Sequence, residues 1–227
     1  MSREIQSCCD FGELLDFTKA ELPKIVREMI YFDDTNFWLG AFMMLFNPFF
    51  WNVGARLEYN TKLISKLCGS AKAGCILLGA TIIFFTFIRS RRYHIVLESQ
   101  PYLSDCYFFM GWPVLTWIGL ALIGWGLVLG VSSLYVLGFY GTYLGDYFGI
   151  LMDAKVTSFP FSVTLHPMYY GSWMQYLGIA LWYRSPAGLL LCCLLLIAYR
   201  TAISFEGPFT EKIYRQRDIK VSGKKQK

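Results

Sequence analysis

Charged residues are scarce in this chain of 227 residues. Asp, Glu, Lys and Arg make up 16% of the sequence, whereas hydrophobic residues make up 55%. A soluble domain of this length carries about 25% charged residues, so the charged, solvent-exposed surface of an ordinary soluble domain is excluded. Residues 106–145 contain none of the four charged types, and apolar stretches of this length are typical of membrane spans. The sequence therefore predicts an integral membrane protein with one compact membrane domain.

Other absences narrow the possible functions. The seven cysteines form no CxxC pair and show no metal-ligand spacing, so neither a disulfide framework nor a metal site is expected. Acidic residues interrupt the first twenty positions, so a secretory signal is not expected there. We expect the lipid bilayer as a partner and no nucleic acid, while the sequence leaves the oligomeric state open.

Apolar segments separated by short polar stretches predict the helices. Residues 37–51 are too few for a full crossing and contain Asn47-Pro48, which favours a re-entrant or interfacial segment. The second apolar segment is closed by a basic cluster that starts at Arg89. Ser185-Pro186 is a favourable helix start, with a capping residue before proline in the first turn. The apolar segments are residues 37–51, 73–88, 108–139, 168–183 and 186–205.

These segments predict an all-α fold. We expect a polytopic membrane helix bundle of about four transmembrane or re-entrant helices, or five if the last two segments form a hairpin. The alternative is that only the final apolar helix crosses the membrane. A hairpin is preferred because it brings the start of residues 168–183 and the end of the final helix to one face.

Polar regions lie at both ends of the membrane domain. Residues 1–36 form a polar leader, in which residues 11–31 are expected to make an amphipathic helix lying on the membrane. Residues 37–206 form the membrane-embedded domain. Residues 207–227 form a basic tail, which the positive-inside rule places in the cytosol. The final Lys224-Lys225-Gln226-Lys227 matches a dilysine retrieval signal of the endoplasmic reticulum; the alternative is simple attraction to anionic lipid.

The stretch TLHPMYYGSW, residues 164–173, carries one of only two histidines in the chain. Proline at the first helical position and an interfacial aromatic belt explain Pro167, Tyr169 and Tyr170 without any ligand. They explain neither His166 nor the small Gly171 one turn into the helix. A close neighbour or a ligand would require that space.

Two further motifs allow both a packing and a binding interpretation. Gly124-Trp125-Gly126 lies in a predicted span, where small residues let helices approach closely, and Gly126 begins a GxxxG pattern. Glu206 is expected at the end of the final apolar helix, where the helix dipole disfavours a negative charge and a cationic ligand would offset that cost. Taken together, the motifs suit a small cation with a polar tail, bound beside an anionic head group.

Five long motifs resemble the phosphatidylethanolamine N-methyltransferase family. The match covers residues 46–217 in order and spacing, and its HPxYxG and terminal Glu pattern is more distantly similar to the isoprenylcysteine carboxyl methyltransferase superfamily. The motifs are FNPFFWNVGARLE (residues 46–58), LGFYGTYLGDYFGIL (137–151), VTSFPF (156–161), HPMYYGS (166–172) and EGPFTEKIYRQ (206–216).

The resemblance implies stepwise methylation of phosphatidylethanolamine, through its mono- and dimethyl intermediates, to phosphatidylcholine with S-adenosylmethionine as methyl donor. It assigns the donor to the GxG of Gly124, Trp125 and Gly126 and to a Glu-Glu pair. That pair falls on Glu206 and Gly207 here, so the second carboxylate is missing. The wall formed by Pro167, Tyr169 and Gly171 is expected to contact the donor as well, and no metal is implied.

The resemblance also implies roles in the reaction. Asp146, His166 or Glu206 would accept the proton that the substrate amine must lose. Of these three side chains, His166 has the intrinsic pKa closest to neutral pH. Aromatic faces at Tyr169, Tyr170 or Trp173 would hold a cation, and Arg200 or Arg215 would meet the lipid phosphate.

The resemblance places the protein in the endoplasmic reticulum membrane with a cytosolic C-terminus, and the mitochondrial membrane is a second location. The alternatives are an enzyme like the isoprenylcysteine carboxyl methyltransferases and a non-enzymatic lipid-binding membrane protein. Binding of S-adenosylmethionine would separate an enzyme from the latter.

Overall fold

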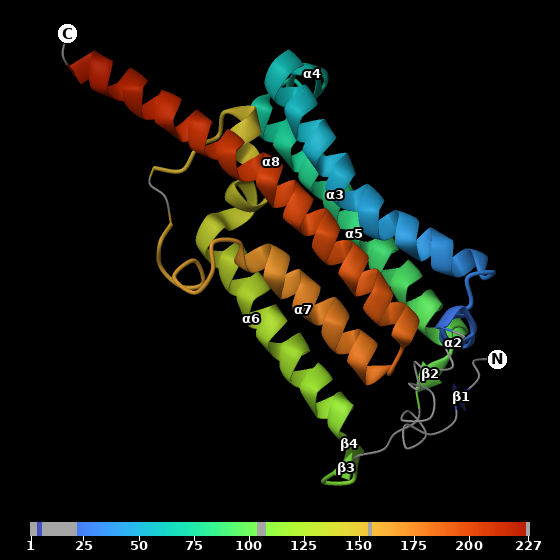
Figure 1. The fold of residues 1–227 in the computed structure, drawn as a ribbon. Helices are drawn as coiled ribbons and strands as arrows, with labels where there is room; N and C mark the ends of the chain where they lie inside the picture. The colour runs from blue at the N-terminus through green and yellow to red at the C-terminus, as the bar shows by residue number, and fades with distance from the viewer. Residues whose placement is uncertain (1–3, 6–21, 104–107, 154–155, 226–227) are drawn as a thin grey trace. The chain divides into compact units, whose positions relative to one another are not determined.

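Helices dominate the computed structural model, which describes residues 4–5, 22–103, 108–153 and 156–225 (Figure 1). The only described strands are two-residue pairs, so the predicted all-α fold is confirmed. The elements in chain order are β1 (Glu4–Ile5), α2 (Leu22–Met29), α3 (Thr35–Thr61), α4 (Leu63–Leu67), α5 (Ala71–Ser99), β2 (Tyr102–Leu103), β3 (Phe108–Phe109), β4 (Trp112–Pro113), α6 (Val114–Thr142), the 3-10 helix η3 (Gly145–Phe148), α7 (Pro167–Trp182) and α8 (Pro186–Lys225).

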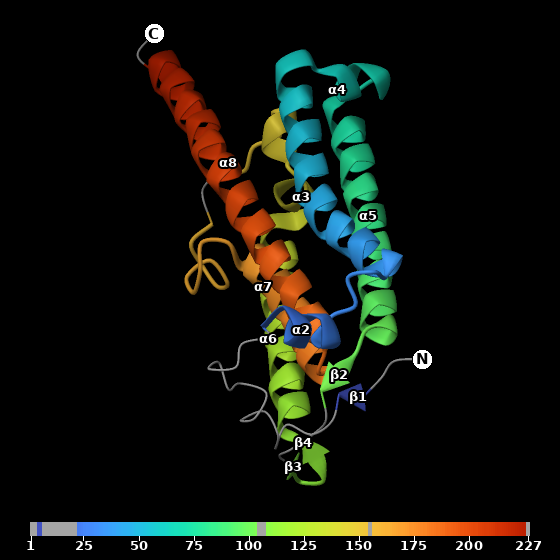
Figure 2. The ribbon, with the colours of Figure 1, turned by 45° about the vertical axis from the view of Figure 1, so that its right-hand side comes forward.

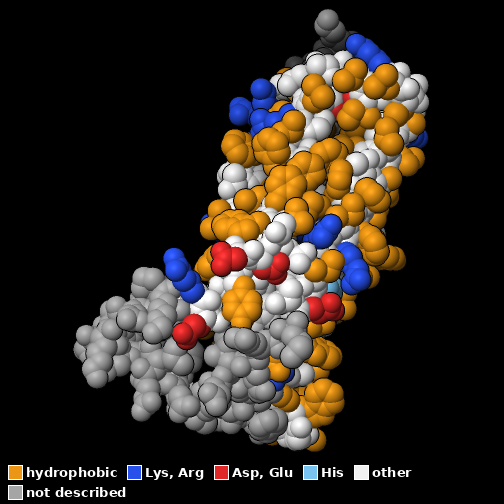
Figure 3. All heavy atoms as spheres, turned by 90° about the vertical axis from the view of Figure 1, so that its right-hand side faces the viewer, with side chains coloured by type: hydrophobic (Ala, Val, Ile, Leu, Met, Phe, Trp, Pro, Cys, Tyr) orange, Lys and Arg blue, Asp and Glu red, His pale blue; other side chains and the backbone are white. Residues whose placement is uncertain are grey.

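Three of the described helices are long and apolar enough to cross a membrane by length and composition. They are Ala71–Ser99, Val114–Phe148 and Pro186–Arg217. Hydrophobic side chains are widespread over the face seen in Figure 3. A soluble protein rarely exposes apolar surface on this scale, whereas a membrane helix bundle turns such side chains toward lipid. The structure is therefore that of an all-α membrane helix bundle.

Residues 37–51, expected to be a short re-entrant or interfacial segment, lie inside the longer helix α3, which runs through Asn47 and Pro48 as one helix of 27 residues. Proline is tolerated inside membrane helices where neighbouring groups satisfy the freed backbone. Large hydrophobic side chains are exposed along one side of α3 over a length of roughly 28 Å, close to the thickness of a bilayer core. These side chains belong to Trp38, Phe42, Leu45, Phe49, Val53 and Leu57.

The basic cluster that was expected to close the second span lies inside α5 instead. The helix continues to Ser99, since arginine is a good helix former and the next helix breaker is Pro101. Arg89 is only 2% exposed. Its Nε donates to the hydroxyl oxygen of Tyr176 at 3.1 Å, and its guanidinium carbon lies 5.0 Å from that ring's centroid.

The final helix also differs from expectation. It begins at Pro186 as predicted, and the Ser185 hydroxyl oxygen caps it by accepting the Gly188 N–H at 3.1 Å. It does not stop near Pro208, however, but continues to Lys225. Pro208 lacks the N–H that would bond the Ser204 carbonyl, and the neighbouring Phe205 carbonyl oxygen accepts the Arg56 Nη2 at 3.0 Å. Glu206 therefore lies inside the helix and not at its C-terminus, so the expected cost of a negative charge at the end of the helix dipole does not arise.

The described chain divides into two compact units. Unit 1 comprises residues 1–45, 87–130 and 168–196, and unit 2 comprises residues 46–86, 131–167 and 197–227. The helices α3, α5, α6 and α8 each contribute residues to both units.

In unit 1, α6 and α7 lie against each other with their backbones in contact (Figure 1). A Cβ built on Gly119 would lie 2.5 Å from the Gly178 carbonyl oxygen, and one on Gly126 would lie 2.4 Å from that of Gly171. The pairing order shows that the helices are antiparallel. Small residues at this spacing are the usual way for membrane helices to approach closely.

Within unit 1, α7 and α8 pack against each other, as the predicted hairpin requires. The described helices that are long and apolar enough to cross a membrane include α8 but not α7, so a crossing by α7 stays a prediction. A Cβ built on Gly188 would lie 3.1 Å from the Ala180 Cβ, and the Trp173 Nε1 donates to Cys192 O at 3.1 Å. From α5, the buried Tyr93 hydroxyl lies within hydrogen-bond distance of two carbonyl oxygens, of Tyr176 at 3.0 Å and of Gly188 at 3.3 Å, which share its one proton. The three helices therefore share one polar junction inside an apolar unit.

In unit 2, α3 and α5 run side by side in both ribbon views (Figures 1 and 2). Phe85 contacts the rings of Phe46 and Phe50 edge to face, with centroids 5.3 and 5.0 Å apart. The Asn47 Nδ2 donates to the Thr86 hydroxyl oxygen at 3.0 Å. Gly138, with φ 63°, interrupts the regular α6 near the end that was expected for this span.

The polar leader falls largely outside the described residues. Of the amphipathic helix expected over residues 11–31, the structure describes residues 22–31, in which α2 covers Leu22–Met29. The loop after α2 is held to the end of α5. The Asp34 carboxylate accepts the Ser99 hydroxyl at 2.7 Å, and the Gln100 amide bonds the Tyr31 backbone N–H and carbonyl at 2.8 and 3.1 Å.

Candidate functional site

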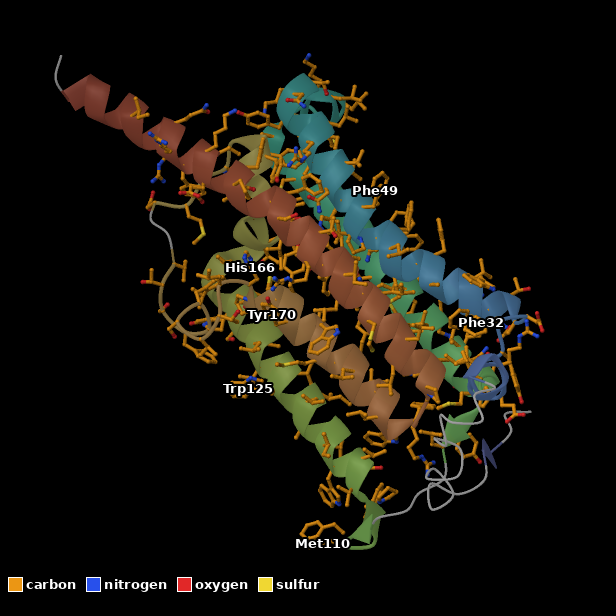
Figure 4. The ribbon with its side chains drawn as sticks, in the orientation of Figure 1. Phe32, Phe49, Met110, Trp125, His166 and Tyr170 are labelled. Atoms are coloured by element: carbon orange, nitrogen blue, oxygen red, sulfur yellow. The ribbon has the colours of Figure 1, made fainter. Side chains whose placement is uncertain are left out.

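The Gly-Trp-Gly motif on α6 presents its three residues to different surroundings. Gly126 is the residue that meets Gly171 of α7, as the packing interpretation requires. Gly124 lies two residues earlier, and a Cβ built there would have no heavy atom within 4 Å. Trp125 is 47% exposed and lies on the side of α6 away from α7 (Figure 4). Of the two glycines, only Gly124 therefore leaves open space for a ligand.

The HPxYxG motif forms the start of α7. Pro167 is the first helical residue, as predicted, and it is buried. Because Gly171 has no side chain, the backbone of α6 can approach it closely. This close neighbour explains the glycine at position 171. Tyr169 is half-buried, as is His166, whose backbone N–H donates to the Thr164 hydroxyl oxygen at 3.5 Å.

Glu206 lies inside α8, in unit 2, and its carboxylate meets two donors from α3. Its Oε1 accepts the Trp51 indole N–H at 3.0 Å and the Asn52 amide N–H at 2.9 Å. Hydrogen bonds to a charged acceptor are among the strong ones in proteins. The carboxylate is therefore held in one orientation by residues that lie some 150 positions away in the chain.

Arg56 supplies positive charge beside this carboxylate. It lies one turn after Asn52 on α3, so the two side chains share a helix face. Besides its bond to the Phe205 carbonyl, its guanidinium lies 5.4 Å from the ring centroids of Phe205 and Phe209. Arg56 is thus engaged by a carbonyl and two aromatic faces.

Asp146 joins η3 to the same part of α8. Its Oδ2 accepts the Thr210 hydroxyl at 2.7 Å, and Thr210 lies one helical turn after Glu206. The next residue, Tyr147, stacks on Phe209 with centroids 4.5 Å apart. Glu206, Asp146 and Arg56 all act electrostatically on the Tyr147 phenol. The charges of two carboxylates and one arginine therefore act on one buried tyrosine.

Several buried polar atoms of unit 2 have no hydrogen-bond partner among the described residues. They are Asn47 Oδ1, Asn52 Oδ1, Thr142 Oγ1 and Tyr147 Oη. Buried polar atoms are nearly always paired in folded proteins, with protein or with ordered water. Asn52 belongs to the side chain that donates to Glu206, and Tyr147 directly follows Asp146. At these two residues a bound ligand or water would complete the hydrogen bonding.

The predicted site residues thus belong to two parts of the structure. Gly124, Trp125, Gly126, Tyr169 and Gly171 lie in unit 1, whereas Asp146, His166, Pro167, Glu206 and Gly207 lie in unit 2. Within unit 2, the charges of Glu206 and Asp146 both act on the Tyr147 phenol, while a Cβ built on Gly207 would meet open space. Assembly of one site from both parts stays a prediction. The described His, Cys, Asp and Glu residues include no group of three placed to hold a metal ion.

Sequence reasoning missed the residues that surround the carboxylates. Trp51, Asn52 and Arg56 lie in a resembling motif, but nothing in their spacing ties them to residues 206–210. The available signal was the pattern of polar side chains one turn apart, at Asn52 and Arg56 and again at Glu206 and Thr210. Such i, i+4 pairs on apolar helices indicate a shared polar face.

Comparisons with known proteins show what the chain is similar to. The family model described as phospholipid methyltransferase matches residues 114–217. The yeast Saccharomyces cerevisiae phosphatidyl-N-methylethanolamine N-methyltransferase is 44% identical over 205 residues, which cover 88% of this chain and 97% of that protein. The rat phosphatidylethanolamine N-methyltransferase is 46% identical, covering 84% of this chain and 95% of its own. The human enzyme of the same name is 44% identical, covering 81% and 90%. No solved structure matches.

Proposed function

The chain belongs to the phospholipid methyltransferase family, and on this basis we propose that it methylates phosphatidylethanolamine. The reaction uses S-adenosylmethionine and proceeds through the mono- and dimethyl intermediates to phosphatidylcholine. The names of the relatives support this substrate series, since some are named for phosphatidylethanolamine and others for its N-methyl derivative. They do not favour a carboxyl methyltransferase acting on prenylated cysteine.

The observation that carries the proposal is the Glu206 carboxylate with its neighbouring unpaired acceptor. S-adenosylmethionine brings ribose hydroxyls and an amino group, all of which are hydrogen-bond donors. Glu206 accepts such donors, and Asn52 Oδ1 is a buried acceptor with no partner among the described residues. The residues present therefore fit the methyl donor. Gly124 lies in unit 1, and its contact with the donor stays a prediction from the resemblance.

Bound S-adenosylmethionine supplies a methyl group activated by its sulfonium. The nitrogen lone pair of the head group forms the new N–C bond, the C–S bond breaks, and sulfur keeps the electron pair. The protein has little covalent work to do, so alignment is its main contribution, on the order of 7–11 kcal/mol. The Trp173 indole is oriented by its bond to Cys192 O, and Tyr169 and Tyr170 offer further faces for a cation.

The head-group amine must lose a proton before it attacks. We propose that Asp146, His166 or Glu206 accepts this proton, directly or through water. Asp146 is already bonded to Thr210, a contact that orients its carboxylate. The lipid phosphate requires a cation, and Arg200 and Arg215 are exposed on α8.

The membrane helices support a location in a lipid bilayer. We propose the endoplasmic reticulum membrane with the basic tail in the cytosol, and the mitochondrial membrane as a second location. The tail continues α8 as helix to Lys225. Fluorescent tagging of the C-terminus with selective permeabilisation of the plasma membrane would check the orientation.

The test compares Glu206→Gln with Glu211→Gln, an exposed carboxylate five residues further along α8. Equilibrium binding of S-adenosylmethionine and transfer of labelled methyl groups are measured for the purified protein in lipid nanodiscs. We expect Glu206→Gln to weaken donor binding by about tenfold or more, since a hydrogen bond to a charged group contributes about 1.5–3 kcal/mol. Glu211→Gln should behave as the unmodified chain.

The lipids offered are phosphatidylethanolamine, its mono- and dimethyl derivatives, and a prenylated cysteine analogue. Transfer to the phospholipids alone supports the proposal. Unmodified protein that binds no S-adenosylmethionine would refute the enzyme, and transfer only to the cysteine analogue would refute the substrate.

A further inference from the structure

Tyr147 holds a buried hydroxyl for which the protein provides no hydrogen bond. The residue is 1% exposed, and its Oη has no partner among the described residues. Burying a hydroxyl unpaired costs about 1–3 kcal/mol, and phenylalanine would fill the same space without that cost. A tyrosine at this position therefore indicates that something outside the described chain completes its hydrogen bonding.

The Tyr147 side chain is firmly held. Its ring stacks on Phe209 at an interplanar angle of 19°. Its carbonyl oxygen accepts the Lys62 ammonium at 3.1 Å, and its backbone N–H donates to the Asp146 carboxylate at 3.1 Å. Because ring and backbone are both anchored, the hydroxyl cannot swing away to find another partner.

The charges around the hydroxyl select the kind of partner. Glu206 and Asp146 place two carboxylates in its electrostatic surroundings, against the single guanidinium of Arg56. Arg56 is itself occupied by the Phe205 carbonyl and two ring faces. A second unpaired acceptor, Asn52 Oδ1, belongs to the side chain that donates to Glu206. Negative charge and unmatched acceptors call for a cation that carries hydrogen-bond donors.

We infer that Tyr147 is a substrate-contacting residue whose hydroxyl oxygen accepts an N–H from a protonated amine. The inference rests on the proposed function, which supplies two such amines. One is the head-group amine of the lipid, and the other is the amino group of the methyl donor. If the amine is that of the head group, each methylation removes one N–H donor. Tyr147 then contributes most to the least methylated substrate.

The test replaces Tyr147 by Phe, which keeps the stacked ring and removes only the unpaired hydroxyl. Tyr135→Phe is the matched control, because Tyr135 is 87% exposed. One arm titrates each of the three phospholipid substrates at saturating S-adenosylmethionine. The other arm titrates S-adenosylmethionine at saturating lipid. Thermal unfolding of both variants is recorded in the same nanodiscs.

We expect Tyr147→Phe to lose about 10- to 100-fold in kcat/KM, the loss of one hydrogen bond to a charged group, with no fall in unfolding temperature. A loss in the lipid arm that shrinks as the amine is methylated identifies the head group. A loss confined to the donor arm identifies the amino group of S-adenosylmethionine.

Two results would overturn the inference. One is a kcat/KM within twofold of the unmodified chain in both arms. The other is a lowered unfolding temperature, because the hydroxyl would then have a partner within the protein. Failure of the proposed function looks different, since the unmodified protein itself would then methylate none of the three lipids.

Discussion

Gly124 and Gly126 form a matched pair that separates helix packing from ligand binding. They lie two residues apart on one helix, and each is expected to respond differently to alanine. A Cβ on Gly126 would lie 2.4 Å from the Gly171 carbonyl oxygen, whereas a Cβ on Gly124 would meet nothing within 4 Å. Both substitutions gain the same helix propensity, up to about 1 kcal/mol. The difference between the two variants therefore isolates the contact with α7.

The size of that difference follows from the contact distance. Cβ atoms essentially never approach a neighbour closer than 3.0 Å, so at 2.4 Å the α6 and α7 backbones must separate by at least about 0.6 Å. Overpacking of this kind costs about 1–3 kcal/mol. For a chain of this size, that corresponds to an unfolding temperature about 2–12 °C lower for Gly126→Ala than for Gly124→Ala.

The assay combines thermal unfolding in nanodiscs with S-adenosylmethionine binding. Gly119→Ala serves as a second packing variant, since its Cβ would lie 2.5 Å from the Gly178 carbonyl oxygen and Gly119 is outside the proposed binding site. We expect Gly119→Ala and Gly126→Ala to unfold at lower temperatures. Gly124→Ala should unfold no earlier than the unmodified chain, while its affinity for S-adenosylmethionine falls.

Equal unfolding temperatures for Gly124→Ala and Gly126→Ala would refute the packing role of Gly126. Unchanged binding of S-adenosylmethionine by Gly124→Ala would refute the binding role of Gly124. The two conclusions are independent, because the variants are scored by different measurements.

The remaining predictions concern polar contacts at the helix junctions. Tyr176→Phe should lower the free energy of unfolding by about 1–3 kcal/mol, because the buried Arg89 loses the acceptor of its Nε. Denaturant titration measures this free energy, and an unchanged midpoint would contradict the prediction. Burial raises the pKa of Asp34, but hydrogen bonds from Ser99 and its neighbours together lower the pKa below its ordinary value of 3.8. Its stabilising effect is therefore complete above that pH and lost as the pH falls below the lowered pKa. The stability gap between the unmodified chain and Asp34→Asn should close on acidification, and a gap independent of pH would argue against this. Glu58→Ala should destabilise the turn into α4, because the fully buried carboxylate accepts two backbone N–H groups there; hydrogen exchange should show faster exchange at those two amides, with α7 amides as the internal reference.

The sequence alone predicted those features that are determined by a single short segment of the chain. The scarcity of charge predicted membrane helices, and three long apolar helices bear this out. Helix starts at Pro167 and Pro186 were predictable because proline fits the first turn and Ser185 caps the second of them. The long motifs led to the family because their order and spacing are specific, and the comparisons confirm it.

Tertiary structure decided what those local rules left open. Helices α3 and α8 continue through Pro48 and Pro208, and at Pro208 a side chain from another helix, Arg56, meets a carbonyl of the turn. The partners of Glu206 come from residues more than 150 positions earlier, a separation that no periodicity records.

The paired glycines show the same division between local and tertiary information. The motif by itself made Gly124 and Gly126 equivalent. A helix turns through 100° per residue, however, so two residues apart they cannot face the same neighbour. Only the position of α7 determines that Gly126 is the packing residue and that Gly124 is left open.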